Sequence, residues 1–295
     1  MTNLHAESIQ APCPLCDSRD GRPAFGSRRP EYRRCNRCDL LFVTERVDDH
    51  EARTVYSSDY YTQREGTDAN TAATVATFRR LTAARHLERI ESLIERGSLL
   101  DVGCGEGYFL QEARHRGWRD VFGLDVSDAA ARLTHRSVPA LVGSLTRGPF
   151  RDHSFDVVAM FDSIEHVLAP KADIAEAARI LKPGGLLYVV TPDAGGWAAR
   201  SMGASWFQLK PREHVTLFSR KNLSRALTDA GFSRIRITSG RKLLSLSFVH
   251  TILRTTNPRL ASWLKICLGA TPLWNRIVLL PTGDMVAVAR RTTQS

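Results

Sequence analysis

The central part of the chain alternates short runs of apolar residues with longer segments in which apolar residues recur at helical spacing. Short apolar runs bounded by turn-forming residues are typical of buried strands, and the periodic segments between them are typical of amphipathic helices. Strands that alternate with helices predict an α/β fold with a parallel sheet covered on both faces. The predicted strands span residues 98–102, 121–124, 140–142, 155–160, 186–190, 234–238 and 284–289, and the predicted helices span 108–116, 128–136, 173–181 and 220–230.

Two segments before this alternation have patterns of their own. Apolar residues recur at helical spacing from 71 to 96 and stop at Gly97, which predicts one long amphipathic helix. Residues 46–70 are polar and rich in turn-forming residues, so we expect a linker or lid there.

Residues 240–283 separate the last two predicted strands and are rich in Leu, Trp and Pro. Within 243–280, the cations Arg254, Lys265 and Arg276 are interspersed among apolar residues. This composition fits an amphipathic element that lies on a membrane surface or covers a greasy substrate. A helical hairpin packed over the functional site is the favoured alternative, because apolar helical faces usually contribute to a core.

The composition is that of an ordinary globular protein, with 43% hydrophobic and 24% charged residues in a chain of 295. No apolar run approaches the roughly 20 residues that a membrane-spanning helix needs. Residues 1–12 lack the basic start and apolar block of a secretory signal, so we expect a cytoplasmic protein. The 41 basic and 31 acidic residues give a net charge of +10, which raises nucleic-acid or anionic-membrane binding as a question without answering it.

Four of the six cysteines form two pairs: Cys13 with Cys16, then, after a gap of 18 residues, Cys35 with Cys38. This spacing is typical of a structural zinc site, in which each pair presents two thiolates from a tight turn and the four complete a tetrahedron. Two disulfides are the alternative, but thiols in the cytosol stay reduced. Because all four positions are cysteine, the metal would support the structure and would not take part in catalysis.

A glycine-rich loop, LLDVGCGEG at residues 99–107, follows the first predicted strand of the sheet. Such a loop lets a ligand approach the backbone, and the helix after it offers N–H groups to an anionic group. The dinucleotide pattern G-x-G-x-x-G is broken, because Tyr108 occupies the position of its third glycine, so an NAD site is disfavoured. Asp101 instead suits a cofactor that carries an ammonium group. Asp125, at the end of the next strand, can accept hydrogen bonds from both hydroxyls of an adenosine ribose.

A polar cluster follows the fourth predicted strand, in the sequence FDVVAMFDSIEHV at residues 155–167. Open α/β sheets bind their ligands beyond the carboxyl ends of the strands, so this cluster is expected at a ligand site. Residues 181–189, LKPGGLLYV, end a helix in a proline–glycine turn and begin the next strand.

Taken together, the segments DVGCGEG, GLDVS, FDVV, DSIEHV and LKPGGLLYV resemble class I S-adenosylmethionine-dependent methyltransferases. The resemblance covers about residues 70–238 and the last strand. It is nearest to the ubiquinone-pathway-like branch, and within it to enzymes with an N-terminal four-cysteine zinc ribbon. It implies an α/β, Rossmann-like seven-stranded sheet in the order 3-2-1-4-5-7-6, preceded by a small zinc ribbon.

The resemblance also implies how the chain is divided. Tyr60 and Tyr61 resemble the lid tyrosines that precede the long helix in ribbon-bearing relatives. The implied parts are a zinc ribbon at 1–45, a linker or lid at 46–70, and a methyltransferase domain at 71–295 with a helical insertion at about 240–283.

The same resemblance implies the residues that hold S-adenosylmethionine. The methionine end would lie against Asp101 and the loop glycines, with two residues after the fourth strand beside it, and Asp125 would hold the ribose. The acid that usually approaches the adenine is absent from the loop VGSL at 142–145, which leaves Ser144 and backbone groups for that role. The implied cofactor residues are Asp101, Gly103, Gly105, Gly107, Asp125, Ser144, Phe161 and Asp162.

Methyl transfer is a displacement at a sulfonium, so the protein must align a nucleophile and neutralise or remove its proton. His166, after Glu165, is one candidate for the base. His214 is the rival candidate, because this branch commonly places a P-x-E-H segment, here residues 211–214, over the substrate. Glu165 with His166 is also a minor alternative site for a magnesium ion that would lower the pKa of a substrate hydroxyl.

The leading hypothesis is methyl transfer from S-adenosylmethionine to a small-molecule, sugar or lipid-linked acceptor, with oxygen as the favoured atom, in bacterial surface-polysaccharide or natural-product biosynthesis. The alternative is a ribosomal-RNA base methyltransferase, since a zinc ribbon and a charge of +10 also resemble those enzymes. The chain lacks the N/D-P-P-Y/F signature of exocyclic-nitrogen enzymes and has FDSI at 161–164 instead. A non-catalytic binding module is a third hypothesis, which the glycine loop and Asp125 disfavour.

Overall fold

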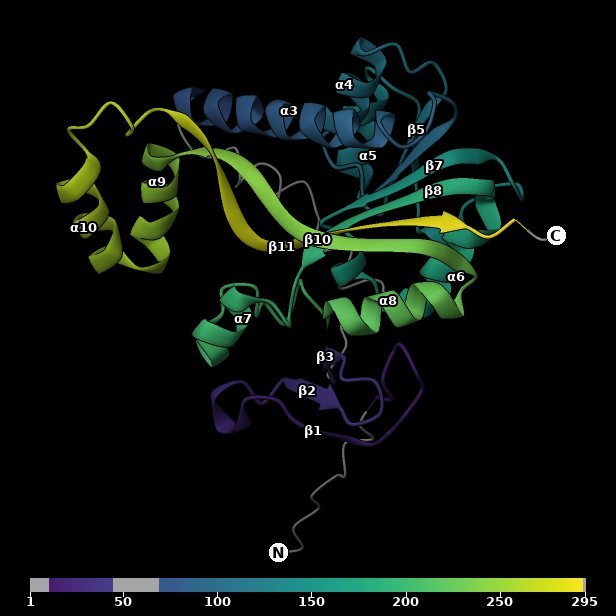
Figure 1. The fold of residues 1–295 in the computed structure, drawn as a ribbon, viewed down its shortest axis with the longest axis horizontal. Coiled ribbons are helices and arrows are strands. Elements are labelled where there is room, and N and C mark those ends of the chain that lie inside the picture. Colours follow the sequence, from purple (N-terminus) through teal and green to yellow (C-terminus); the bar gives the residue numbers. More distant parts are fainter. Residues whose placement is uncertain (1–10, 45–68, 294–295) are drawn as a thin grey trace, which may run out of the picture.

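The computed structural model describes residues 11–44 and 69–293, and Figure 1 shows its fold. The main sheet contains β4 (Leu99–Val102), β5 (Val121–Asp125), β6 (Ala140–Val142), β7 (Phe155–Phe161), β8 (Leu181–Pro192), β10 (Phe232–Ser245) and β11 (Ile277–Arg291). Their order is β10-β11-β8-β7-β4-β5-β6. When the strands of this sheet are numbered from β4, the order reads 3-2-1-4-5-7-6 from the β6 edge. The expected Rossmann-like α/β fold is therefore confirmed.

Helices cover both faces of this sheet because side chains on each strand alternate between the faces. Leu99 and Val157 share a core with α3 and α4 on one face, whereas Leu100 and Val158 share a core with α6 and α8 on the other. α5 packs beside β5 and β6. The helices around the sheet are α3 (Ala69–Glu91), α4 (Tyr108–His115), α5 (Asp128–His135), α6 (Pro170–Ile180) and α8 (Arg220–Asp229).

The long helix α3 ends five residues earlier than its apolar spacing predicts. The Glu91 carboxylate, at its end, accepts hydrogen bonds from Trp118 Nε1 (3.0 Å) and Arg116 Nη2 (2.7 Å). Leu93 N then donates to Ile90 O at 2.9 Å, which closes a tighter turn and directs the chain into β4.

The N-terminal cysteine-containing segment forms a second sheet that includes a distant part of the chain. Its strands are β1 (Gly21–Pro23), β2 (Tyr32–Cys35), β3 (Leu41–Val43) and β9 (Thr216–Leu217), in that order. β3 pairs antiparallel with β9, so that Leu41 faces Leu217 and Phe42 faces Thr216. Figure 1 shows this segment packed beneath α7 (Trp197–Met202) and α8. The remaining short helices are η1 (Gly26–Arg28), η2 (Leu145–Arg147), η3 (Ile164–His166) and η4 (Gly203–Ser205).

β10 and β11 continue beyond the body of the sheet as a two-stranded arm (Figure 1). Their pairing runs on from Arg241 opposite Pro281 to Ser245 opposite Ile277, so both strands are longer than the sequence predicts. Two helices, α9 (Leu246–Thr256) and α10 (Pro258–Leu268), lie at the end of the arm. We call residues 246–276 the tip. The expected insertion at 240–283 thus consists of strand at both ends and a helix pair between them.

Candidate functional site

The glycine loop between β4 and α4 is held against the neighbouring strand. Gly103 N and Cys104 N donate to Leu124 O at 2.7 and 3.1 Å. Gly103, Gly105 and Gly107 have φ of 77°, 53° and 78°, in the left-handed region that only glycine enters readily. A Cβ on Gly103 would lie 2.6 Å from Ser163 Cβ, whereas a Cβ on Gly105 would meet no atom within 4 Å. The loop therefore packs against the segment after β7 at one glycine and opens to space at another.

This contrast predicts different outcomes for two matched substitutions. We expect Gly103→Ala to destabilise the chain by about 2–4 kcal/mol, because it adds a clash with Ser163 to the strain of its positive φ. Gly105→Ala should cost only about 1–2 kcal/mol, from backbone strain alone. Urea unfolding of both variants measures the difference, and equal losses would contradict the packing described for Gly103.

Asp101, at the end of β4, is a buried carboxylic acid with an unsatisfied oxygen. It is 2% exposed, and its Oδ1 has no hydrogen-bond partner among the described residues. Burial, together with the charge of Asp125, raises the pKa of Asp101 to about 8. An ammonium group placed beside this carboxyl would supply both the missing partner and a counter-charge. The observation fits the amino group of the methionine end of S-adenosylmethionine.

Asp125, at the end of β5, points toward the glycine loop. Its Oδ2 accepts a hydrogen bond from Gly105 N at 2.9 Å and its Oδ1 accepts one from Ser127 N at 2.8 Å. A carboxylate has about four acceptor positions, so both oxygens keep capacity for ribose hydroxyls. Burial raises the pKa of Asp125, and the two N–H bonds oppose that shift. The two carboxylates thus lie at one edge of the sheet.

Ser144 lies beyond β6 and next to the strand that ends in Asp125. Gly143 N donates to Asp125 O at 2.8 Å, which joins the two strand ends. Val126 and Val142 are 41% and 55% exposed at the same ends, an apolar surface that sequence reasoning missed. Such a surface suits a planar base, and Ser144 is half-buried beside it.

Phe161 and Asp162, at the end of β7, have different surroundings. The Phe161 ring packs against Phe109, with ring centroids 4.4 Å apart, beneath α3 and α4. Asp162 has φ 46°, and its carboxylate forms an ion pair of 3.1 Å with Lys242 Nζ, which lies on the arm and also contacts Asp284 at 3.2 Å. Sequence reasoning missed Lys242, because 80 residues separate it from Asp162 and no motif joins them.

The two rival histidines lie side by side. The rings of His166, in η3, and His214, before β9, are 4.9 Å apart and meet edge to face. His166 Nδ1 bonds to Glu213 O and His214 Nδ1 bonds to Gln208 O, both at 2.8 Å. Because a carbonyl oxygen only accepts, each Nδ1 carries the proton and each Nε2 carries the lone pair of a neutral ring. Burial lowers the pKa of both rings, and that of His214 falls to about 4.

Glu165, which precedes His166 in η3, is a buried acid. It is 1% exposed and accepts a hydrogen bond of 2.9 Å from Thr191 Oγ1, on β8. Burial, and then the charge of Asp162, raise its pKa well above the ordinary value. Potential ligand atoms of Glu165, His166 and His214 lie within 4.8 Å of one another. Two imidazoles suit transition metals better than magnesium, which prefers oxygen ligands.

The four cysteines of the N-terminal segment come together. Cys13 Sγ lies 3.5 Å from Cys38 Sγ, and Cys16 Sγ lies 3.5 Å from Cys35 Sγ, so each contact joins one cysteine from each pair. None forms a disulfide, and the four sulfurs lie within 4.8 Å of one another. This arrangement fits the tetrahedral donor set of a structural zinc ion.

This cysteine segment also supports the loop that carries His214. Tyr32 Oη, on β2, donates to His214 O at 3.1 Å, and the β3–β9 pairing begins two residues beyond His214. The short strand β9 has no periodic signal in the sequence, so its partnership was not predicted. The position of His214 therefore depends on the N-terminal segment.

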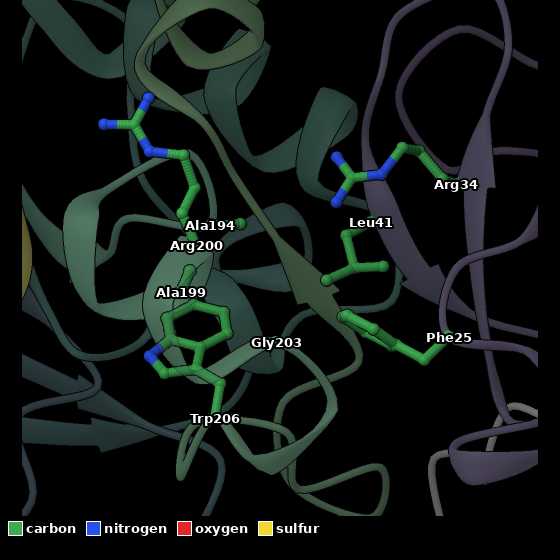
Figure 2. Close-up of a pocket in the computed structure, with 8 residues that line it drawn as sticks. All are labelled: Phe25, Arg34, Leu41, Ala194, Ala199, Arg200, Gly203 and Trp206. Atoms are coloured by element: carbon green, nitrogen blue, oxygen red, sulfur yellow. The ribbon is translucent and has the colours of Figure 1, made fainter.

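A cavity of about 220 Å³ lies between the cysteine segment and the chain after β8. Figure 2 shows apolar side chains of Phe25, Leu41 and Trp206 facing one another across it. No candidate site residue lines this cavity, so we regard it as a packing gap between two parts of the chain.

Two further expectations concern other parts of the chain. The expected lid tyrosines, Tyr60 and Tyr61, fall outside the described residues. Within the described residues, every helix is too short or too polar to cross a bilayer.

Comparisons with known proteins bear on the whole arrangement. A family described as a methyltransferase domain matches residues 75–236. Malonyl-[acyl-carrier protein] O-methyltransferase of Serratia marcescens is 29% identical over 160 residues, which is 53% of this chain and 61% of that protein. Ubiquinone biosynthesis O-methyltransferase of Thiobacillus denitrificans is 30% identical over 154 residues, 48% of this chain and 66% of that protein. The chain thus spans less than two thirds of either relative. A solved S-adenosylmethionine-dependent methyltransferase from Thermotoga maritima shares the fold, with TM-score 0.53, 20% identity, 82% of this chain covered and 100% of that one.

Proposed function

We propose that this chain, which belongs to the methyltransferase domain family, transfers a methyl group from S-adenosylmethionine to a hydroxyl oxygen of a small-molecule, sugar or lipid-linked acceptor. The observation that carries the proposal is the pair of neutral histidines at the sheet edge where the glycine loop opens. Gly103 packs against Ser163, so the loop and the histidine-bearing η3 adjoin. Both relatives named above are O-methyltransferases by name, which supports oxygen as the acceptor atom.

In this proposal, different residues bind different parts of the cofactor. Bound S-adenosylmethionine would supply a methyl group activated by a sulfonium. Asp101 would hold the ammonium group, Asp125 the ribose hydroxyls, and Ser144 with the apolar strand ends the adenine. The open space over Gly105 leaves room for the ligand to approach the backbone. Phe161 and Asp162 flank the methionine side.

Of the two histidines, His166 is the better candidate for the general base. His214 is 6% exposed and its pKa is lowered to about 4 by burial and by His166, which makes it a weak base. His166 is half-buried, so its ring is more accessible to an acceptor than that of His214, and burial also lowers its pKa. We therefore assign His166 to removal of the acceptor proton and His214 to positioning of the His166 ring. Glu165 is a buried acid with a raised pKa, and its carboxyl lies within 4.8 Å of ring nitrogens of both histidines.

We place the acceptor among the hydroxyl compounds of bacterial surface-polysaccharide or natural-product biosynthesis, as the resemblance of the sequence implies. We also propose that the four cysteines hold a structural zinc ion. No step in this mechanism requires a second metal.

Calorimetry with S-adenosylhomocysteine, which binds without reacting, tests the cofactor site. We expect Asp101→Asn and Asp125→Asn each to weaken binding by about 10–100-fold, since a hydrogen bond to a charged group contributes about 1.5–3 kcal/mol. Asp120→Asn, at an exposed position, is the matched control. Because the pKa of Asp101 is about 8, its carboxyl is protonated in the free chain at pH 7, and binding of an ammonium group should release that proton.

Buffers of different ionisation enthalpy measure this release. Wild type should release close to one proton at pH 7, and Asp101→Asn should release none. Unchanged affinity in both aspartate variants would remove the proposed cofactor site.

A further inference from the structure

The tip packs against the long helix α3 and is closed by hydrogen bonds of its own. Phe248, on α9, packs against Phe78 of α3 with ring centroids 5.2 Å apart. Ser247 N donates to Trp274 O at 2.9 Å, and Asn257 caps α10 through Leu260 N at 3.1 Å. Figure 1 shows both helices standing away from the sheet at the end of the arm. The tip therefore presents a defined outer surface.

Several large apolar side chains of the tip are exposed. Trp263 is 61% exposed and Ile266 is 82% exposed, and both lie on α10. With Arg259 they follow the spacing i, i+4, i+7, which places the three on one face of the helix. Leu260 and Leu273 add apolar surface at 45% and 44% exposure. A gathering of exposed apolar side chains at one place marks an interaction surface.

The charge of the tip has a single sign. Residues 246–276 contain the cations Arg254, Arg259, Lys265 and Arg276 and no Asp or Glu, although the whole chain has 31 acidic residues. Long basic side chains can lay their methylene stems on apolar surface and keep the charged ends at a polar boundary. This combination suits a partner that is negatively charged at its surface and apolar just below it.

The tip also contains a pocket between α9 and α10 that is lined by basic residues. Its volume is about 660 Å³, and its basic lining residues are His250, Arg254 and Lys265. Ile266 and Ala261 supply apolar walls. Three basic groups and no acid around one pocket would bind a phosphate whose acyl chains continue toward the apolar face.

We infer that the tip is a docking surface for a bilayer that contains anionic phospholipid. α9 and α10 have 11 residues each, which is about 16 Å of helix, so they lie on the membrane and do not cross it. Pairing of two tips from two copies is disfavoured, because it would bring cations together with no acid between them. A nucleic acid would satisfy the cations but would leave the aliphatic side chain of Ile266 exposed to water. Of these three occupants, the bilayer is the one that accommodates both features.

Vesicle flotation of the full chain tests this inference, with vesicles of pure phosphatidylcholine compared with vesicles that include phosphatidylglycerol. Wild type should float only with the anionic vesicles, and added salt should weaken the binding. The variant W263S/I266S should lose about tenfold or more in affinity, because it removes two side chains expected to enter the interface. Trp197→Ser is the matched control, because Trp197 is equally exposed, at 60%, on α7.

The charge contribution is tested separately with R254Q/K265Q. Each cation near an anionic surface contributes about 1 kcal/mol, so this double variant should lose about 25-fold. Equal binding to neutral vesicles, or an equal loss in Trp197→Ser, would overturn the inference. Absence of vesicle binding by wild type would also overturn it. Binding of an RNA oligonucleotide would then identify a nucleic acid as the partner, and a dimer in light scattering that Ile266→Ser converts to a monomer would identify a second copy of the chain.

Discussion

Replacing His166 with Asn will lower the rate of methyl transfer to a hydroxyl acceptor by about 10²–10⁴-fold, the usual contribution of a positioned general base. Asn keeps a polar side chain able to bond to Glu213 O but has no basic nitrogen. His214→Asn should lose less, about tenfold, because the pKa of His214, about 4, leaves it a positioning role. The measurement is release of S-adenosylhomocysteine with a panel of sugar, phenolic and lipid-linked hydroxyl acceptors.

The pH profile separates a base from a structural residue. The pKa of His166 is lowered by burial, so its ring stays neutral below the ordinary histidine range. We expect kcat/KM in wild type to stay level near neutral pH and to fall only as His166 becomes protonated, below about 6.5, the ordinary histidine value. His166→Asn should lose that acid limb and keep its affinity for S-adenosylhomocysteine. His115→Asn, on the exposed end of α4, is the control. A His166→Asn variant with an unchanged acid limb would assign the base elsewhere.

We expect replacement of Cys13 with Ser to release the zinc ion that we propose for the four cysteines and to destabilise the N-terminal segment by several kcal/mol, because structural zinc contributes about 10–16 kcal/mol to small zinc-binding peptides. The Cys13 side chain is completely buried within 3.5 Å of Cys38 Sγ, so no other group can take its place. Elemental analysis of the purified chain and thermal unfolding measure the two effects. Cys267→Ser, at an exposed lone cysteine, should change neither.

The same variant should impair turnover more than cofactor binding. Tyr32 and the β3–β9 pairing hold the backbone at His214 and just beyond it, whereas Asp101 and Asp125 lie on strands that the cysteine segment does not join. Loss of the segment would therefore disturb the histidine pair and leave the glycine loop in place. Stoichiometric zinc in Cys13→Ser, or a wild-type chain that binds none, would contradict the zinc assignment.

The sequence was most informative where local pattern and burial agree. Phe155–Phe161 is a strand that is apolar apart from Asp156, and α8 begins where the sequence predicts a helix, with the Ser219 hydroxyl accepting a hydrogen bond from Asn222 N at 3.4 Å. The glycine loop was recognised because three glycines at alternate positions are hard to explain as helix or strand. These features depend on residues within a few positions of one another.

The main contacts that the sequence did not predict join distant residues. β9 has two residues, too few for a period, and it exists because β3 supplies its hydrogen bonds. Lys242 contacts Asp162 and Asp284 because the arm brings β10 past the end of β7. The sequence offers His166 and His214 as rival candidates for the base. Their spacing along the chain does not show that the structure places their rings 4.9 Å apart.

The place of β11 within the sheet constrains how the chain folds during synthesis. β11 follows the other six strands of this sheet along the sequence but lies between β10 and β8, so neither neighbour can pair with it until residues 277–291 have left the ribosome. Until then β8 presents an unpaired edge to other chains. A nascent chain stalled near the tip should accordingly be prone to aggregation and need chaperones, whereas release of the final strand closes the sheet in one late step.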